Sequence, residues 1–542
     1  MSNSSRTKTL ALVALLIASF LINLETTAVN VALPSLVREL GASTTQLQWV
    51  VDAYNLAFAA LLLTFGSLSD RFGRKGMLMS GLTVFGLASV AGGFATTSTG
   101  LILARTVMGV GAAMTFPATL SLIRNIYEDR AERARAIGLW GATAGMAIAV
   151  GPILGGWLLE RYSWSSIFYA MGPVAALGLL LAAVAVPKSR DNRKHAIDLP
   201  GLVLSTVTMA IVVYTIIEAP THGWLAGRSV AGWVTSAVLA TVFVWWESRV
   251  EYPMLDVRLF RNMRFTAASG TVTIAFFTLF GFSFLMTQYF QFVRDFSPVS
   301  TGLRLLPIAV AVGIGSIIGT QLAIRFGTKL VVTVGMVFIT AFYLWVALAI
   351  SLTLPYPTIA AQMVLFGIGF GLTSAPATES IMGAVTARQA GIGSAVNDTT
   401  RLLGGTLGVA IIGSVASSVY SARLADTLPS VLPAGVTDTV TESLGGALAV
   451  TQQLIAGGQQ EIAGVVQSSA FEAYVHAVSI GCYVSVGLAA VGALLALVYL
   501  PAQPPADIAA FDGDGLDDND LEEVGFEDVV LTGLAPLPTL HN

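Results

Sequence analysis

Charged residues are scarce in this sequence. They make up 11% of its 542 residues, against roughly a quarter in soluble domains, while 55% of the residues are hydrophobic. Most of such a chain cannot face water, so the solvent around it must be lipid. The apolar residues also come in separate runs of about twenty, the length that crosses a hydrocarbon layer. We therefore predict an all-α integral membrane protein in which each run is one transmembrane helix.

Cysteine, histidine and lysine are also rare, and each scarcity excludes a class of chemistry. Cys482 is the one cysteine, so no disulfide can form within the chain. The four histidines are scattered without the spacing of metal ligands, so we expect no metal site. None of the five lysines follows a glycine, which excludes the Gly-Lys pair of a phosphate-binding P-loop. With neither a nucleophile elbow nor a zinc cluster in the sequence, we expect no enzyme and no cofactor.

Fourteen apolar runs follow a six, two, six pattern. We predict an N-terminal six-helix bundle over residues 1–190, two linker helices over 191–257, a C-terminal six-helix bundle over 258–500 and an acidic, disordered tail over 501–542. The last two spans are predicted at Gly391–Val415 and Glu472–Tyr499. Between them, residues 417–470 leave the membrane, either as a loose loop or with a short amphipathic helix over the opening.

Basic residues fix the direction of these spans. With the N-terminus in the cytoplasm, 20 of the 28 lysines and arginines fall in cytoplasmic segments, six fall outside, and Arg105 and Arg401 lie within helices. This distribution follows the positive-inside rule. It predicts a multi-pass protein of the cell membrane with both termini in the cytoplasm.

The two predicted bundles share a sequence element. Residues 66–75 read GSLSDRFGRK and residues 320–329 read TQLAIRFGTK, so that Arg71, Gly73 and Lys75 repeat as Arg325, Gly327 and Lys329 at one constant offset. This indicates two homologous halves, an architecture that places a binding path at their interface.

The repeated segment resembles the motif that joins the second and third helices in the major facilitator superfamily. The residues that match are Gly66, Asp70, Arg71, Gly73, Arg74 and Lys75. Asp70 can pair with basic residues of a neighbouring helix end and so stabilise one conformation. Its counterpart in the second copy is Ile324, where such a latch is weaker.

Three further segments narrow the resemblance to drug:proton antiporters with fourteen helices. Glu25 stands where the family usually has aspartate, and Arg105 precedes a glycine pair, with Met108 in place of the family's common glutamine. The fifth span carries a segment similar to the exporters' motif, at Gly151, Pro152, Gly155 and Gly156. Its glycines serve either close helix packing or gating. The resemblance implies a multidrug efflux protein driven by the proton gradient.

Charged side chains within the spans are candidates for proton coupling and substrate binding, because burying them in lipid is costly. Glu25 is the candidate proton and cation acceptor, Asp52 a second acidic contact and Arg105 the group that modulates them. The alternative role of Glu25 is a structural salt bridge with Arg105. The alternative for Asp52 is a water-exposed position at the level of the lipid headgroups. Asp398 and Arg401 lie three residues apart on one helix face, as a structural pair or as substrate contacts.

The expected cargo is amphipathic and cationic, which aromatic side chains would bind by stacking and cation–π attraction. The candidates for the cavity are Tyr54, Trp140, Phe284, Tyr289 and Phe292. We expect small-molecule substrates, protons and membrane lipids as partners, no nucleic acid, and a monomer. Two other functions stay open, a flippase of lipids or lipid precursors and a non-transporting sensor with a transporter fold.

Overall fold

The computed structural model describes residues 5–127, 129–189, 198–251, 253, 255, 257–385, 390–428 and 434–502. Residues 503–542, nearly all of the acidic tail predicted to be disordered, lie outside this part. The described chain is helical throughout, without strands. Fourteen of its helices are long and apolar enough to cross a membrane, which agrees with the predicted number. Helices suit lipid because every backbone donor and acceptor is paired within the segment.

Six helices form the first set. They are α1 (Ser5–Leu40), α2 (Thr44–Phe72), α3 (Arg74–Gly93), α4 (Ser98–Ile126), α5 (Arg130–Arg161) and α6 (Ser165–Ala185). Within this set α1 packs on α4, α5 and α6, while α4 also packs on α2 and α3. Local sequence explains where α2 begins: Ser43 and Gln46 form a reciprocal capping box that satisfies two backbone N–H groups.

The remaining spans comprise two linker helices and a second set of six. The linkers are α7 (Leu199–His222) and α8 (Gly227–Glu247), followed by the 3-10 turn η1 (Val257–Arg261). The second set is α9 (Met263–Gln288), which continues as a π-helical turn η2 (Tyr289–Val293), α10 (Pro298–Phe326), α11 (Thr328–Ala349), α12 (Tyr356–Met382), α13 (Ala390–Ala425) and α16 (Gln460–Tyr499). Helix α7 packs on α8 and also on α2 and α13, so it touches both sets.

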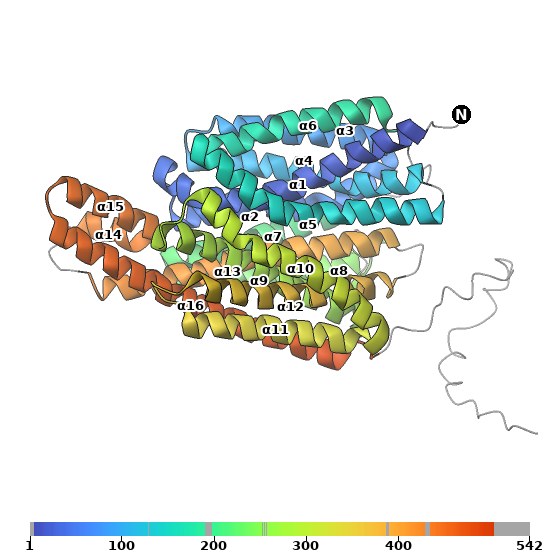
Figure 1. The fold of residues 1–542 in the computed structure, drawn as a ribbon. Helices are drawn as coiled ribbons and strands as arrows, with labels where there is room; N and C mark the ends of the chain where they lie inside the picture. Colours follow the sequence, from blue (N-terminus) through green and yellow to red (C-terminus); the bar gives the residue numbers. More distant parts are fainter. Residues whose placement is uncertain are drawn as a thin grey trace, which may run out of the picture. The chain divides into compact units, whose positions relative to one another are not determined.

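The described residues between the last two predicted spans are mostly helical. Helix α13 extends to Ala425 and α16 begins at Gln460, well beyond the predicted limits, and the short helices α14 (Ala434–Glu442) and α15 (Leu444–Ala456) lie between them. Helix α15 packs on α16 and α1. Figure 1 shows α14 and α15 at one end of the bundle and the start of α1 at the other. We call these the outer end and the inner end.

The two sets repeat one packing detail. Gly81 of α3 crosses α4 where an added Cβ would lie 2.8 Å from the carbonyl oxygen of Gly111. Gly335 of α11 crosses α12 in the same way, 2.7 Å from the carbonyl oxygen of Gly369. Glycine permits this close approach of two helix backbones.

Candidate functional site

A cavity lies between the two sets of helices. Seven spans contribute to it, namely α1, α2, α4 and α5 from the first set and α9, α10 and α13 from the second. Its wall is mostly apolar, with asparagine and hydroxyl side chains from α1 and α9. The lining residues are Asn23, Thr26, Thr27, Asn30, Val31, Phe58, Phe116, Ala144, Ile148, Pro152, Phe276, Leu279, Phe280, Ser283, Thr287, Leu305, Ile308, Asp398, Arg401 and Leu402.

Asp398 and Arg401 are the charged residues of this lining. Arg401 Nη1 lies 3.8 Å from Asp398 Oδ1, one helical turn away on α13. The guanidinium also donates to the hydroxyl of Thr378 on α12, at 3.1 Å, and stands 5.4 Å from the ring centre of Phe276 on α9. The pair is therefore held by two neighbouring helices while both members face the cavity.

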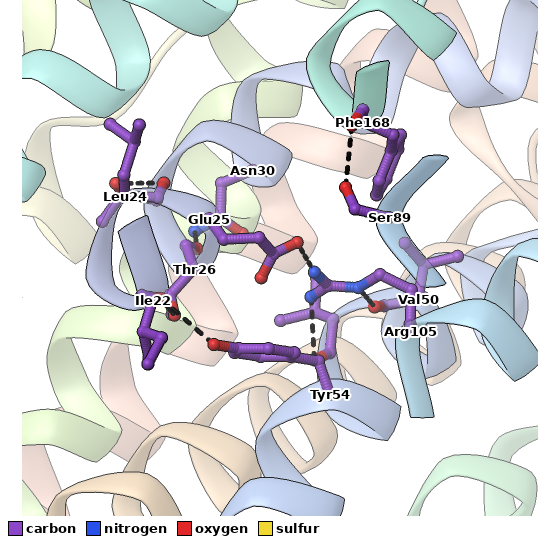
Figure 2. Close-up of polar contacts among 12 residues, drawn as sticks. Ile22, Leu24, Glu25, Thr26, Asn30, Val50, Tyr54, Ser89, Arg105 and Phe168 are labelled. Carbon is purple, nitrogen blue, oxygen red and sulfur yellow. Dashed lines mark hydrogen bonds and ion pairs between the residues drawn. The ribbon is translucent and has the colours of Figure 1, made fainter. Parts of the chain in front are cut away.

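Glu25 and Arg105 meet inside the first set, away from the cavity lining. Their side chains form an ion pair between α1 and α4, with exposures of 0% and 1% (Figure 2). Arg105 Nε donates to the carbonyl oxygen of Val50 on α2 at 2.6 Å, and its guanidinium lies 4.7 Å from the ring centre of Tyr54. One arginine thus joins three helices. Glu25 is next to cavity-lining residues of α1 but points the other way.

Asp52 is fully buried on α2, one helical turn beyond Gln48. In the described part of the chain neither of its carboxylate oxygens has a hydrogen-bond partner. Asn55, three residues further along the same helix, is also buried, and its side-chain nitrogen and oxygen have no hydrogen-bond partner in the described chain. Asp52 is therefore buried and does not take the water-exposed position considered as an alternative.

The five aromatic side chains predicted for the cavity lie elsewhere. Phe284 is wholly buried in α9, and the hydroxyls of Tyr54 and Tyr289 donate to backbone carbonyls. Trp140 packs behind Phe116, and Phe292 lies under the guanidinium of Arg38. The rings that line the cavity are Phe58, Phe116, Phe276 and Phe280. In a helix that is apolar on every side, hydrophobic periodicity does not reveal which face turns inward.

The motif between α2 and α3 lies at the inner end and is tied to α6. Gly73 has φ 114°, a value that favours glycine, and it ends α2 and begins α3. Arg74 donates from its backbone and side chain to Ser189, and Lys75 donates to the carbonyl oxygen of Ala183 at 2.7 Å. Gly66 packs near Pro117, and Arg71 lies over Phe72. The side chain of Asp70 is outside the described part of the chain.

The glycine motif of α5 contacts helices on both sides. Gly151 and Gly155 pack on Thr27 and Ala28 of α1. A Cβ added to Gly156 would lie 2.7 Å from the backbone carbon of Pro298, at the start of α10. Pro152 lines the cavity and borders Gly302 of α10. The motif therefore packs the first set internally and also joins the two sets.

A second group of contacts joins the two sets at the outer end, and sequence patterns did not reveal it. Gln48 of α2 donates to Val409 and Ala410 of α13, at 3.2 and 2.9 Å, and to the hydroxyl of Ser414. Gln291, in the π-helical turn, donates to the carbonyl oxygen of Val31 on α1 at 2.9 Å. The sequence feature that could have indicated these contacts is the presence of glutamine side chains within otherwise apolar runs. These bonds join the two sets at the end where α14 and α15 lie.

Known proteins resemble the chain in sequence and in fold. The family model of the Major Facilitator Superfamily matches residues 15–409. The multidrug resistance protein Stp of Mycobacterium tuberculosis is 35% identical over 79% of this chain and 80% of its own length. The multidrug efflux pump LfrA of Mycolicibacterium smegmatis is 34% identical over 83% and 90%. A solved bacterial homologue of the human lysosomal transporter Spinster, inward-facing and unoccupied, covers 93% of this chain and 100% of its own with a TM-score of 0.64 at 16% identity.

Proposed function

The chain belongs to the major facilitator superfamily of membrane transporters, and on that premise we propose that it exports amphipathic, lipophilic cations in exchange for protons. The observation that carries this proposal is the cavity between the two sets of helices. Its wall combines apolar surface, four aromatic rings and one carboxylate, Asp398, which is paired with Arg401 of the same lining. Aromatic faces beside a carboxylate suit flat, lipophilic cations. The two mycobacterial relatives are named for multidrug resistance and multidrug efflux, which supports drugs as the cargo.

Transport requires that the cavity open to one side of the membrane at a time. Helices α5 and α10 touch at the outer end, and so do α2 and α13. We take this as the form closed to the outside, with the inner end and both termini in the cytoplasm. The reverse step would separate Gln48 from α13 and Gly302 from α5. The inner end, where the α2–α3 motif lies, would close in that form.

The charged residues divide into two groups with different proposed roles. Asp398 and Arg401 face the cavity, so cationic cargo would meet Asp398 there. Glu25 and Arg105 lie behind the wall, where a proton taken up by Glu25 would leave Arg105 buried without its counter-charge. An unpaired buried charge is unstable, so protonation would drive α1 and α4 to rearrange. Asp52 is the second buried acid that could hold a proton.

Transport by the purified chain in liposomes tests this function. With an acidic lumen and neutral medium outside, ethidium is expected to accumulate in vesicles whose transporter faces inside out, and a proton ionophore should abolish the accumulation. The variant D398N should transport ethidium poorly, while D438N, an exposed acid on α14, should match the wild type. Accumulation that survives the ionophore would rule out proton coupling.

The same liposomes separate the other two functions. A flippase would move fluorescent phospholipids between leaflets with headgroup selectivity and would need no proton gradient. A sensor would bind ethidium without any net movement. Either result, together with absent ethidium accumulation, would replace the proposal made here.

A further inference from the structure

We propose that the inner end of α8 carries a binding site for the phosphate headgroup of an anionic phospholipid. A hollow there is lined by three arginines, two valines and a serine: Arg249, Arg258, Arg261, Val244, Val257 and Ser248. No acidic residue of the described chain lines it. The site is separate from the central cavity, with which it shares no lining residue.

The arginines come from two different segments. Arg249 follows the last turn of α8, whereas Arg258 and Arg261 belong to the short turn η1 that precedes α9. Arg258 Nη2 donates to the carbonyl oxygen of Ser248 at 3.4 Å, which holds η1 against the end of α8. The positive-inside rule explains why this connector is basic, but it does not require three guanidinium groups to converge on one hollow.

The hollow lies where lipid headgroups are expected. Only 11% of the residues in an apolar 18-residue stretch of α8 are buried, the lowest such share among the fourteen spans, so most of its surface faces lipid. Trp245, next to the hollow, is 52% exposed, and the guanidinium of Arg249 stands 5.0 Å from its ring centre. Tryptophan and arginine together mark the boundary between hydrocarbon and water.

The chemistry of the lining fits a lipid phosphate better than a free one. Guanidinium groups bind phosphate oxygens with paired hydrogen bonds and are weakly hydrated, so several of them can surround one phosphate. Val244 is 52% exposed and gives the hollow an apolar wall against which the glycerol and first acyl carbons would pack. Inorganic phosphate has no apolar part that could pack against such a wall. Basic pockets at this membrane level are a known form of lipid recognition.

Lipid titration of the purified full-length chain in detergent tests this proposal. Phosphatidylglycerol is expected to raise the melting temperature of the wild type in a saturable way, whereas phosphatidylcholine and inorganic phosphate should not. The triple variant R249Q/R258Q/R261Q should require on the order of a hundredfold more phosphatidylglycerol, at a factor of about five for each arginine. The variant R135Q, which removes an exposed arginine at the inner end of α5 outside the hollow, should titrate like the wild type.

A second variant keeps all three arginines and so preserves the charges that orient the chain. Val257→Glu places a carboxylate in the hollow and should abolish the phosphatidylglycerol effect, while Val257→Gln should retain most of it. The proposal is overturned if V257E and the triple variant both respond like the wild type, or if R135Q loses the effect equally. Equal stabilisation by phosphatidylcholine, or by inorganic phosphate alone, would also exclude an anionic lipid as the ligand.

Discussion

Glu25 on α1 and Arg105 on α4 form an ion pair that is closed off from both water and the central cavity. Arg105 is also fixed by the carbonyl oxygen of Val50 and by the ring of Tyr54. The pair therefore stabilises the packing of three helices and at the same time places an acid one residue away from the cavity wall. This arrangement leads to the first of four predictions.

Neutralising one member of the pair should cost more stability than neutralising both. Glu25→Gln leaves Arg105 charged and buried, and we expect a loss of about 3–5 kcal/mol in the free energy of unfolding. The double variant E25Q/R105Q should recover most of that loss without recovering proton-driven efflux. Thermal unfolding in detergent and ethidium transport in liposomes measure the two effects. A double variant that is no more stable than E25Q would show that the pair is not the source of the loss.

We expect Asp52 to lower the stability of the folded protein and yet to be required for transport. Its carboxylate is buried without a hydrogen-bond partner in the described chain, and a charge buried in this way costs more than a neutral amide. Asp52→Asn is therefore expected to stabilise the protein by about 1–3 kcal/mol. If Asp52 holds a proton during transport, the same variant should lose the dependence of efflux on the pH gradient. The exposed substitution D438N should change neither quantity. Lower stability of D52N would indicate that Asp52 has a favourable partner in the folded protein.

Gly302 should favour the form in which the outer end is closed. A Cβ at this position of α10 would lie 2.6 Å from the backbone carbon of Pro152, so G302A must push α10 away from α5. At an overpacking cost of about 1–3 kcal/mol, the ratio of the closed form to the open form should fall roughly 5–150-fold. In a C482A background, a cysteine at the cavity position Ser283 should then react faster with a membrane-impermeant thiol reagent added from outside.

The matched control for this prediction is G141A in α5. An added Cβ there has no atom within 4 Å in the described chain, so labelling from outside should keep its wild-type rate. Faster labelling in G141A, or an unchanged rate in G302A, would contradict the proposed role of the α5–α10 contact.

Phe116 should contribute to cargo affinity through its aromatic face. It lines the cavity with its ring 5.7 Å from that of Phe58, centre to centre. Because cation–π attraction contributes about 0.5–2 kcal/mol, F116L should weaken ethidium binding by roughly 2- to 30-fold. Fluorescence titration measures this change. Phe284→Leu alters a buried ring outside the cavity and serves as the control, since it should change stability more than affinity.

The number and length of the apolar runs determined the fold class of this protein without help from the structure. Fourteen apolar runs predicted fourteen spanning helices, because lipid accepts only segments whose backbone groups are paired internally. The repeated RFG segment predicted related halves, and both copies turn at a glycine with positive φ, Gly73 and Gly327. The spacing of Asp398 and Arg401 correctly placed them on one helix face, because neighbours on a single helix depend only on its pitch.

Tertiary structure alone decided which buried groups face the cavity. Asp398 and Arg401 line it, whereas Glu25 and Arg105 pair behind its wall, and the aromatic lining comes from rings that the sequence did not single out. Tertiary packing also decided that residues 417–470 are mostly helical and that Gln48 and Gln291 join the two sets. The reason is that most faces of these helices are apolar, so the pattern along one helix rarely distinguishes contact with lipid, with another helix and with a cavity.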